Sequence, residues 1–212
     1  NLKFAQNKSK NILLPKNLKK FILKKSAWCA SSTHKGEEFI CIKTHKILKK
    51  KYKNFLTIVI PRHIDRCGEL IDLFNSHDLK VHCHSWKNKE PKEIDIYLVD
   101  SYGETEKFFN LTKIVFIGGS LINHGGQNPL EPARHGCKVL HGPHVDNFKD
   151  IYNFLNRIKI SKKIGSEKSL TKNIEIQLKN KETTKSITKK VKNLGTKILN
   201  SANKEILSTI KK

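Results

Sequence analysis

The stretch Phe116–Pro132, here called the glycine segment, reads FIGGSLINHGGQNPLEP and joins the end of an apolar run to the start of a helical pattern. Gly118-Gly119 closes the apolar run, and Gly125-Gly126 makes a second bend. Glycine adopts backbone angles that other residues avoid and lets other groups approach the main chain. Asn128-Pro129 follows, and Asn is a favoured N-cap while Pro is a favoured first helical residue. The segment therefore predicts a strand, a bare turn and a helix N-terminus.

Short apolar runs alternate with helical patterns on both sides of this segment. The runs are rich in β-branched and aromatic residues, as buried parallel strands are. Strands that alternate with helices indicate βαβ units, so the sequence predicts an α/β fold built on a doubly wound parallel sheet. The predicted strands are 26–31, 55–60, 80–84, 94–99, 114–117 and 138–140, and the predicted helices are 36–50, 65–76, 104–111 and 129–135.

One helical pattern also indicates which of its faces is buried. Within 36–50, apolar residues recur at the spacing of one helix face, and only a lysine interrupts them. We predict that this stripe packs on the sheet as part of the core. It consists of Phe39, Ile40, Lys43, Ile47 and Leu48.

The composition of the chain changes after residue 160. The 212 residues are enough for a domain with a real core, which we place at 26–160. Residues 161–212 are rich in Lys, Asn, Ser and Thr, and Ile and Leu recur through 170–178 and 187–199, which predicts peripheral amphipathic helices. No apolar run reaches the roughly 20 residues of a membrane span, so we expect a soluble or peripheral chain.

The chain carries 42 Lys and Arg residues against 19 Asp and Glu residues, a net charge of +23. Only four of the basic residues are Arg, whose planar guanidinium binds phosphate through two hydrogen bonds. Because aromatic stacking platforms are also missing, we expect no nucleic-acid partner. The lysine excess has two interpretations, a background bias in composition or a basic face for an anionic membrane surface.

Five cysteines are scattered through the chain with no CxxC spacing, which predicts reduced thiols and no disulfide framework. The tract His82-Cys83-His84 has residue types that bind metals. On a strand, however, the two histidines share one face and the cysteine points to the other, so the three do not converge on one ion. The sequence predicts neither a metal site nor a cofactor.

Polar clusters follow three of the predicted strands. Ser31–Glu38 follows the first strand, Arg62-His63 the second, and the glycine segment the fifth. Ligands of doubly wound sheets bind outside the carboxyl ends of the strands, so we expect these loops to form one cleft. The helix that starts near Asn128 aims free N–H groups at this cleft, as a phosphate site requires, and Arg62 is suited to clamp the phosphate.

Glu131 lies in the first turn of that helix and has two interpretations. Its carboxylate can accept two hydroxyls of a ribose, or it can satisfy its own helix N-terminus. The glycine segment is neither the GxGxxG of dinucleotide dehydrogenases nor a P-loop, since no GKS or GKT is present.

Five motifs follow one another along the chain: ASSTHKGEE (30–38), IVIPRH (58–63), FIGGSL (116–121), GGQNPLEPARHG (125–136) and LHGPHVDNFKDI (140–151). Together they make the chain resemble the C-terminal half of the bacterial 3-deoxy-D-manno-octulosonic acid (Kdo) transferases. The opening Asn1–Phe4 is also similar to the GNLKF stretch of that family, where the N-terminal domain joins the second domain. The resemblance extends to about Tyr152 and fades in the Lys-rich tail.

This resemblance implies a GT-B glycosyltransferase of lipopolysaccharide biosynthesis, with two Rossmann-like domains. The chain would be the C-terminal domain, which binds the sugar nucleotide CMP-Kdo, and residues 1–25 would enter from an N-terminal domain that the sequence does not contain. That domain would hold the lipid A precursor and the carboxylate base of an inverting transfer. The implied location is the cytoplasmic face of the bacterial inner membrane, and we expect this fragment alone to be inactive.

The family motifs also imply roles for single residues. Glu131 is expected at the ribose and Arg62 at the phosphate of CMP. Gln127 departs from the family, in which many members have His, and Gln cannot become cationic. The other residues implied to hold CMP and the sugar are Gly118, Gly119, Ser120, Gly125, Gly126 and Asn128, and those implied to line the cleft are Ser32, Thr33, His34, Glu37, His63 and Gln127.

A second hypothesis belongs to a different functional class. The chain would be a nucleotide-sugar-binding module without catalytic activity, and its Lys-rich tail would recruit it to a membrane or to a partner chain. A preceding domain of similar size in the full reading frame would favour the transferase, and a start codon directly before Asn1 would favour the module.

Overall fold

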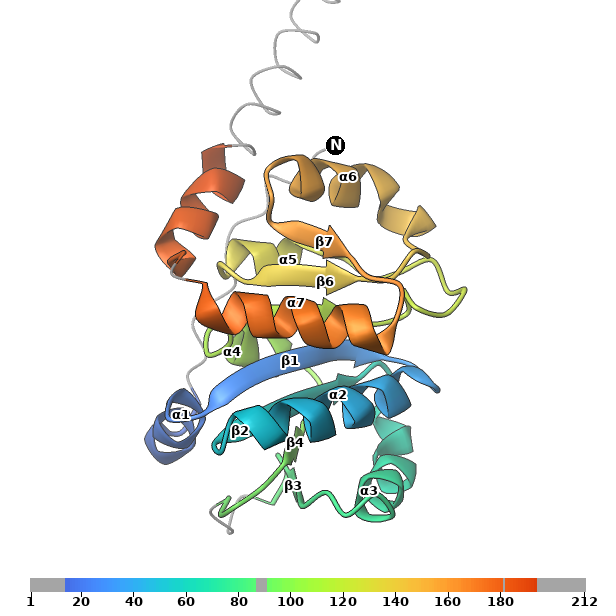
Figure 1. Cartoon of the computed structure of the whole chain (residues 1–212), viewed down its shortest axis with the longest axis vertical. Coiled ribbons are helices and arrows are strands. Elements are labelled where there is room, and N and C mark those ends of the chain that lie inside the picture. Colours follow the sequence, from blue (N-terminus) through green and yellow to red (C-terminus); the bar gives the residue numbers. More distant parts are fainter. Residues whose placement is uncertain (1–13, 87–90, 181, 194–212) are drawn as a thin grey trace, which may run out of the picture.

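The computed structural model of the chain describes residues 14–86, 91–180 and 182–193. The predicted parallel sheet is confirmed: seven strands lie in the order β3-β4-β2-β1-β5-β6-β7, and every neighbouring pair is parallel (Figure 1). The strands are β1 (Ser26–Thr33), β2 (Phe55–Pro61), β3 (Val81–Cys83), β4 (Ile96–Leu98), β5 (Ile114–Ile117), β6 (Lys138–His141) and β7 (Ser161–Lys163).

Helices cover both faces of this sheet, as a doubly wound fold requires. The helices are α1 (Lys16–Leu23), α2 (Glu37–Lys51), α3 (Cys67–Asn75), α4 (Thr105–Phe109), α5 (Leu130–Arg134), α6 (Lys149–Arg157) and α7 (Glu167–Lys179), with short 3-10 turns at Ile64–Arg66 and Asp146–Phe148. Residues 184–193 are also helical. Of these, α1 and α6 were not predicted from the sequence.

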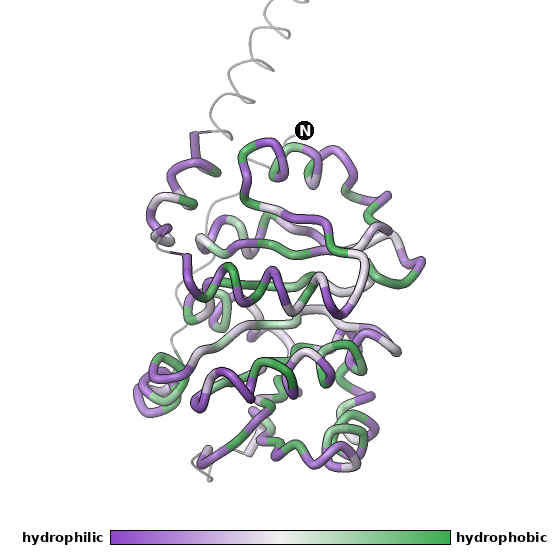
Figure 2. Tube along the Cα trace, in the orientation of Figure 1, coloured by the Kyte–Doolittle hydropathy of each residue, from purple (hydrophilic) through white to green (hydrophobic). Residues whose placement is uncertain are grey.

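Side chains alternate between the two faces along each strand, so the core has two halves. On one face, strand residues such as Trp28 and Phe116 pack with α2 and α7, and α3 covers β4 and β2. On the other face, Cys29 and Val115 pack with α1, α4, α5 and α6. Figure 2 shows polar and apolar residues alternating along α7, as expected of a helix with one buried face.

The buried face of α2 differs from the predicted stripe. Phe39 is 40% exposed and Ile47 is 39% exposed, so the prediction that they face the core is wrong. Polar residues take core positions instead, because they find buried partners. Thr44 accepts a hydrogen bond from Thr171 of α7 at 3.2 Å. The residues of α2 that are buried are Glu37, Glu38, Cys41, Ile42, Thr44, His45 and Leu48.

A buried polar network ties α2 to the strands beneath it. The ring of His45 lies between the Thr57 hydroxyl, at 2.8 Å, and the Asp95 carboxylate, at 3.3 Å. Asp95 also accepts from Lys49 and from the backbone N–H of Lys80. Burial by itself would raise the pKa of Asp95, but these hydrogen bonds hold the pKa well below its usual range. The network explains why polar residues are stable at this interface.

The Lys-rich tail contributes to the sheet itself. β7 pairs with β6, so the sheet extends past residue 160. The predicted helix at 170–178 is confirmed as part of α7, and its Leu170 and Ile174 are buried against α2. The helix predicted at 187–199 lies only partly within the described residues, where Ile187 and Val191 join the core. The Asn1–Phe4 motif lies outside the described residues.

All five cysteines are buried and free. His82 stacks on Tyr97 while Cys83 packs in the core on the other face of β3, which confirms that the tract does not converge. Within 14–86, 91–180 and 182–193, no group of three potential metal ligands occurs, and none of the helices there is long and apolar enough to cross a membrane.

Candidate functional site

The strand order changes direction at the centre of the sheet. From β1 the chain passes through α2 to β2 on one side, whereas β5 pairs with β1 on the other side. Ligands of open α/β sheets bind in the crevice at such a switch point. The predicted convergence of the loops is confirmed there: Gly118 donates to the Ser31 carbonyl at 2.8 Å and Arg62 donates to the Thr33 carbonyl at 3.0 Å, both through backbone N–H groups.

The Glu37 carboxylate holds two of these loops together. One of its oxygens accepts from the backbone N–H groups of His34, at 3.0 Å, and Gly119, at 2.7 Å. The other accepts from the N–H groups of Ser120, at 3.1 Å, and Leu121, at 3.0 Å. Burial raises the pKa of Glu37, and the four hydrogen bonds oppose that rise. Glu37 is therefore an internal anion beneath the glycine segment, and it does not line an open surface.

The glycines of the site make room for the protein's own loops. A Cβ on Gly118 would lie 2.3 Å from the carbonyl oxygen of Ser32, and one on Gly142 would lie 2.0 Å from that of Ser120. Gly125 and Gly126 have φ values of +82° and +74°, which side chains rarely allow. The glycines, which have no side chain, thus allow the loops after β1, β5 and β6 to pack against one another.

Three histidines, His34, His63 and His124, meet above this packed layer and are here called the histidine cluster. The ring centroid of His34 lies 4.2 Å from that of His124 and 6.2 Å from that of His63. The Nε2 atom of His34 and the hydroxyl of Thr33 are buried without a hydrogen-bond partner among the described residues. Sequence reasoning left His124 out of the site, although its place inside the glycine segment was a signal for including it.

The predicted helix N-terminus forms one residue later than expected. α5 begins at Leu130, and the Asn128 side-chain oxygen accepts from the backbone N–H of Leu130 at 3.1 Å. Glu131 is half-buried in the first turn of α5. Its pKa is raised mainly by burial and, to a smaller extent, by the nearby Glu106 carboxylate. Sequence reasoning did not select Glu106. The backbone carbonyl of Gln127 accepts a hydrogen bond from the Tyr152 hydroxyl at 2.9 Å.

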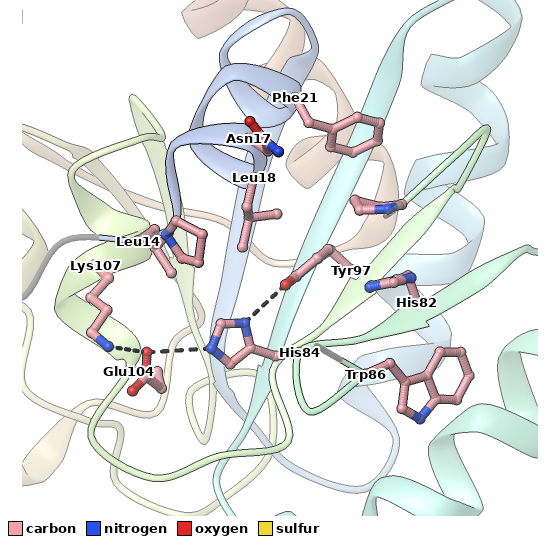
Figure 3. A pocket seen from close by; sticks show the side chains of 12 residues that line it. Leu14, Asn17, Leu18, Phe21, His82, His84, Trp86, Tyr97, Glu104 and Lys107 are labelled. Carbon is pink, nitrogen blue, oxygen red and sulfur yellow. Dashed lines mark hydrogen bonds and ion pairs between the residues drawn. The ribbon is translucent and has the colours of Figure 1, made fainter. Parts of the chain in front are cut away.

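A separate cavity of about 520 Å³ lies between α1 and the β3–β4 edge of the sheet (Figure 3). Leu18, Phe21 and Trp86 form apolar walls. Among its polar groups, His84 contacts the Tyr97 hydroxyl at 2.8 Å and the Glu104 carboxylate at 3.4 Å, and Lys107 pairs with Glu104 at 2.5 Å. None of the predicted site residues lines this cavity.

Several curated proteins are similar to the chain in sequence. The 3-deoxy-D-manno-octulosonic acid transferase of Haemophilus influenzae is 35% identical over 156 residues, which cover 73% of this chain and 36% of the relative. That of Aquifex aeolicus is 31% identical over 192 residues, covering 86% of this chain and 50% of the relative. The chain thus spans between a third and a half of the length of these two relatives. No family model matches the chain.

Solved structures share the fold. The C-terminal CMP-Kdo binding domain of WaaA from Acinetobacter baumannii superimposes with a TM-score of 0.74 at 24% identity, covering 81% of this chain and 90% of that domain. A C-terminal domain of a group 1 glycosyl transferase from Francisella tularensis superimposes with a TM-score of 0.51 at 14% identity, covering 87% of this chain and 94% of that one. These matches agree with the doubly wound architecture predicted from the sequence.

Proposed function

The chain is related in sequence to 3-deoxy-D-manno-octulosonic acid transferases over most of its length, and from this premise we propose that it is the donor-binding domain of such an enzyme. The observation that carries the proposal is this sequence similarity. The ligand would be CMP-Kdo, bound where the loops after β1, β2 and β5 converge at the switch point of the sheet.

The contacts of the site favour a particular placement of the nucleotide. Glu37 already occupies the N–H groups of Gly119 and Ser120, so the phosphate would lie at the rim, where Arg62 is exposed, rather than on those N–H groups. Glu131 would face the ribose from the first turn of α5. When the glycosidic bond breaks, negative charge grows on the CMP phosphate, and a fixed guanidinium there would stabilise that charge.

The acceptor side of the reaction belongs to the same proposal. The part of the enzyme that precedes this domain would bind a lipid A precursor and supply the carboxylate base of an inverting transfer. Exposed lysines would hold the enzyme at the cytoplasmic face of the inner membrane by attraction to anionic lipids. This fragment alone would bind CMP without turning over.

Calorimetric titration of the chain with CMP, AMP and UMP tests the donor site. We expect selective binding of CMP. Arg62→Ala and Glu131→Ala should each weaken it by roughly 1 to 3 kcal/mol, because each removes a charged hydrogen-bonding group. Arg157→Ala, an exposed arginine in the last turn of α6, is the matched control and should leave CMP affinity unchanged.

Three outcomes separate the alternatives. Equal affinity for the three nucleotides would contradict the donor-domain proposal. Selective CMP binding that survives both site substitutions would exclude Arg62 and Glu131 from the site. Selective CMP binding by the chain, together with failure of the complete enzyme to transfer Kdo, would favour the non-catalytic module.

A further inference from the structure

The histidine cluster brings imidazoles from separate loops onto one small area of backbone. His34 follows β1, His63 follows β2, and His124 lies in the glycine segment after β5. A Cβ on Gly119 would lie 3.1 Å from the His34 ring and 3.3 Å from the His124 ring, so glycine at this position lets both rings lie against the backbone. The exposed Arg62 adds a permanent positive charge next to the cluster.

Basic side chains outnumber acidic ones around His34. His124, His63 and Arg62 face it from the neighbouring loops, and the Ser32 carbonyl lies 3.0 Å from its Nδ1 atom. The carboxylate that faces it is Glu37, at 3.9 Å, which already accepts four N–H hydrogen bonds. Burial, followed by the charges of His124, His63 and Arg62, lowers the pKa of His34, while the Ser32 carbonyl acts against this shift.

The surroundings of His34 select one tautomer of its neutral imidazole. Its Nδ1 carries the proton, because that atom faces a carbonyl oxygen that can only accept. Its Nε2 then carries a lone pair and has no partner among the described residues. A cluster in this state is short of negative charge, and an anion nearby would favour the protonated imidazoles.

We infer that the histidine cluster is the subsite for the acid group of the donor sugar, and that the donor takes up a proton when it binds. This inference rests on the proposed function, because an octulosonic acid carries a carboxylate that neutral sugars lack. The phosphate contacts the Arg62 guanidinium at the rim, and the sugar carboxylate lies against the imidazoles. The proton comes from solvent and binds to an imidazole nitrogen, and no other bond is made or broken.

The test compares CMP-Kdo with the methyl ester of CMP, because both are phosphodiesters and differ by the sugar acid. Both are titrated calorimetrically into the intact chain in two buffers of different ionisation enthalpy. We expect CMP-Kdo to bind with net proton uptake. Its affinity relative to the methyl ester should fall by about tenfold from about pH 6 to about pH 8, because proton uptake by His34 beside the sugar carboxylate becomes less favourable as the pH rises above the ordinary range of histidine.

Substitutions assign the effect to the cluster. His34→Gln and His124→Gln should each reduce the preference for CMP-Kdo over the methyl ester and abolish its pH dependence, because Gln cannot take up a proton. His124 is exposed, so this variant tests the subsite even if the buried His34 variant fails to fold. His77→Gln, in the turn that follows α3, is the matched control and should keep both the preference and its pH dependence.

The possible results separate this inference from its premise. Equal affinity for the two ligands, or binding of CMP-Kdo without proton uptake, overturns the subsite while selective nucleotide binding still supports the donor domain. A preference for CMP-Kdo that remains pH-dependent in His124→Gln and His34→Gln also overturns it. Failure of the wild-type chain to bind either ligand overturns both proposals.

Discussion

Glu37 holds a turn rich in backbone N–H groups in place. N–H groups that point to one spot form an anion-binding nest, and here the anion is a side chain of the protein. The carboxylate links the loop after β1 to the loop after β5 through four hydrogen bonds. The shape of the proposed donor site therefore depends on a residue that we do not expect to touch the donor.

Glu37→Gln should destabilise the protein by roughly 2 to 4 kcal/mol, because an amide NH₂ would replace an oxygen that accepts two N–H hydrogen bonds in a buried site. The free energy of unfolding in urea measures this loss. Glu69→Gln is the matched control, since Glu69 is 51% exposed and its ion pair with Arg66 at 3.6 Å lies at the surface. Equal stability of the two variants would show that Glu37 does not hold the loops together.

Sequence reasoning predicted which strand ends come together but not the contacts between them. Arg62, His34 and the glycine segment were selected because they follow strands, and strand ends converge in any doubly wound sheet. Glu37 was predicted to line the cleft. Three of its four N–H partners lie 82 to 84 residues further along the chain, and no local pattern records a contact over that distance.

At the scale of elements, the loops after β1, β5 and β6 pack through glycines that leave no space for a side chain. Gly118 lies on the backbone of Ser32, and Ser32 itself has a φ of +57°, which is uncommon for a residue with a side chain. Gly142 lies on the backbone of Ser120, whose hydroxyl oxygen accepts from the Gly142 N–H at 2.8 Å. The loops thus form one layer at the switch point.

Gly142→Ala should lower the free energy of unfolding by roughly 2 kcal/mol or more, because the new methyl group would overlap backbone atoms that cannot rotate away. Thermal or urea unfolding measures the effect. The control is Gly68→Ala in α3, where the added Cβ meets nothing within 4 Å. That change should raise stability by about 0.5 kcal/mol, because alanine loses less conformational entropy in a helix. A neutral Gly142→Ala would contradict the close packing of these loops.

The buried face of α2 was predicted wrongly because contacts with other elements, and not the helix itself, decide which of its residues are buried. Hydrophobic periodicity assumes that polar residues face water, and α2 breaks this assumption with Thr44 and His45. Both are fully buried because Thr171, Thr57 and Asp95 satisfy them from other elements. The sequence pattern of α2 alone does not contain those partners.

At the scale of the whole molecule, the tail completes the domain. β7 extends the sheet beside β6, and α7 covers the sheet next to α2, so the face that carries Trp28 and Phe116 is closed by one helix from each half of the chain (Figure 1). The sequence boundary at residue 160 reflects a change in surface composition, since the tail is Lys-rich on its exposed side. The core does not end there.

Ile174→Ala should destabilise the protein by roughly 2 to 5 kcal/mol, because it leaves a cavity between α7 and α2. Ile176→Ala, two residues along the same helix, is the matched control, since Ile176 is 48% exposed while Ile174 is fully buried. The free energy of unfolding should change little for the control. If the two variants lose the same stability, α7 is not packed on this domain as described.

The sequence by itself determined the parallel α/β sheet and the family resemblance, and it predicted the sheet edge at which we place the site. These follow from local information, namely the alternation of short apolar runs with helical patterns and motifs at strand ends. The tertiary structure decided that Glu37 fills the N–H nest, that the glycines serve loop packing, that polar residues of α2 are buried and that β7 belongs to the sheet. Each of these depends on contacts between residues far apart in the chain, and such contacts exist only once the sheet has brought them together.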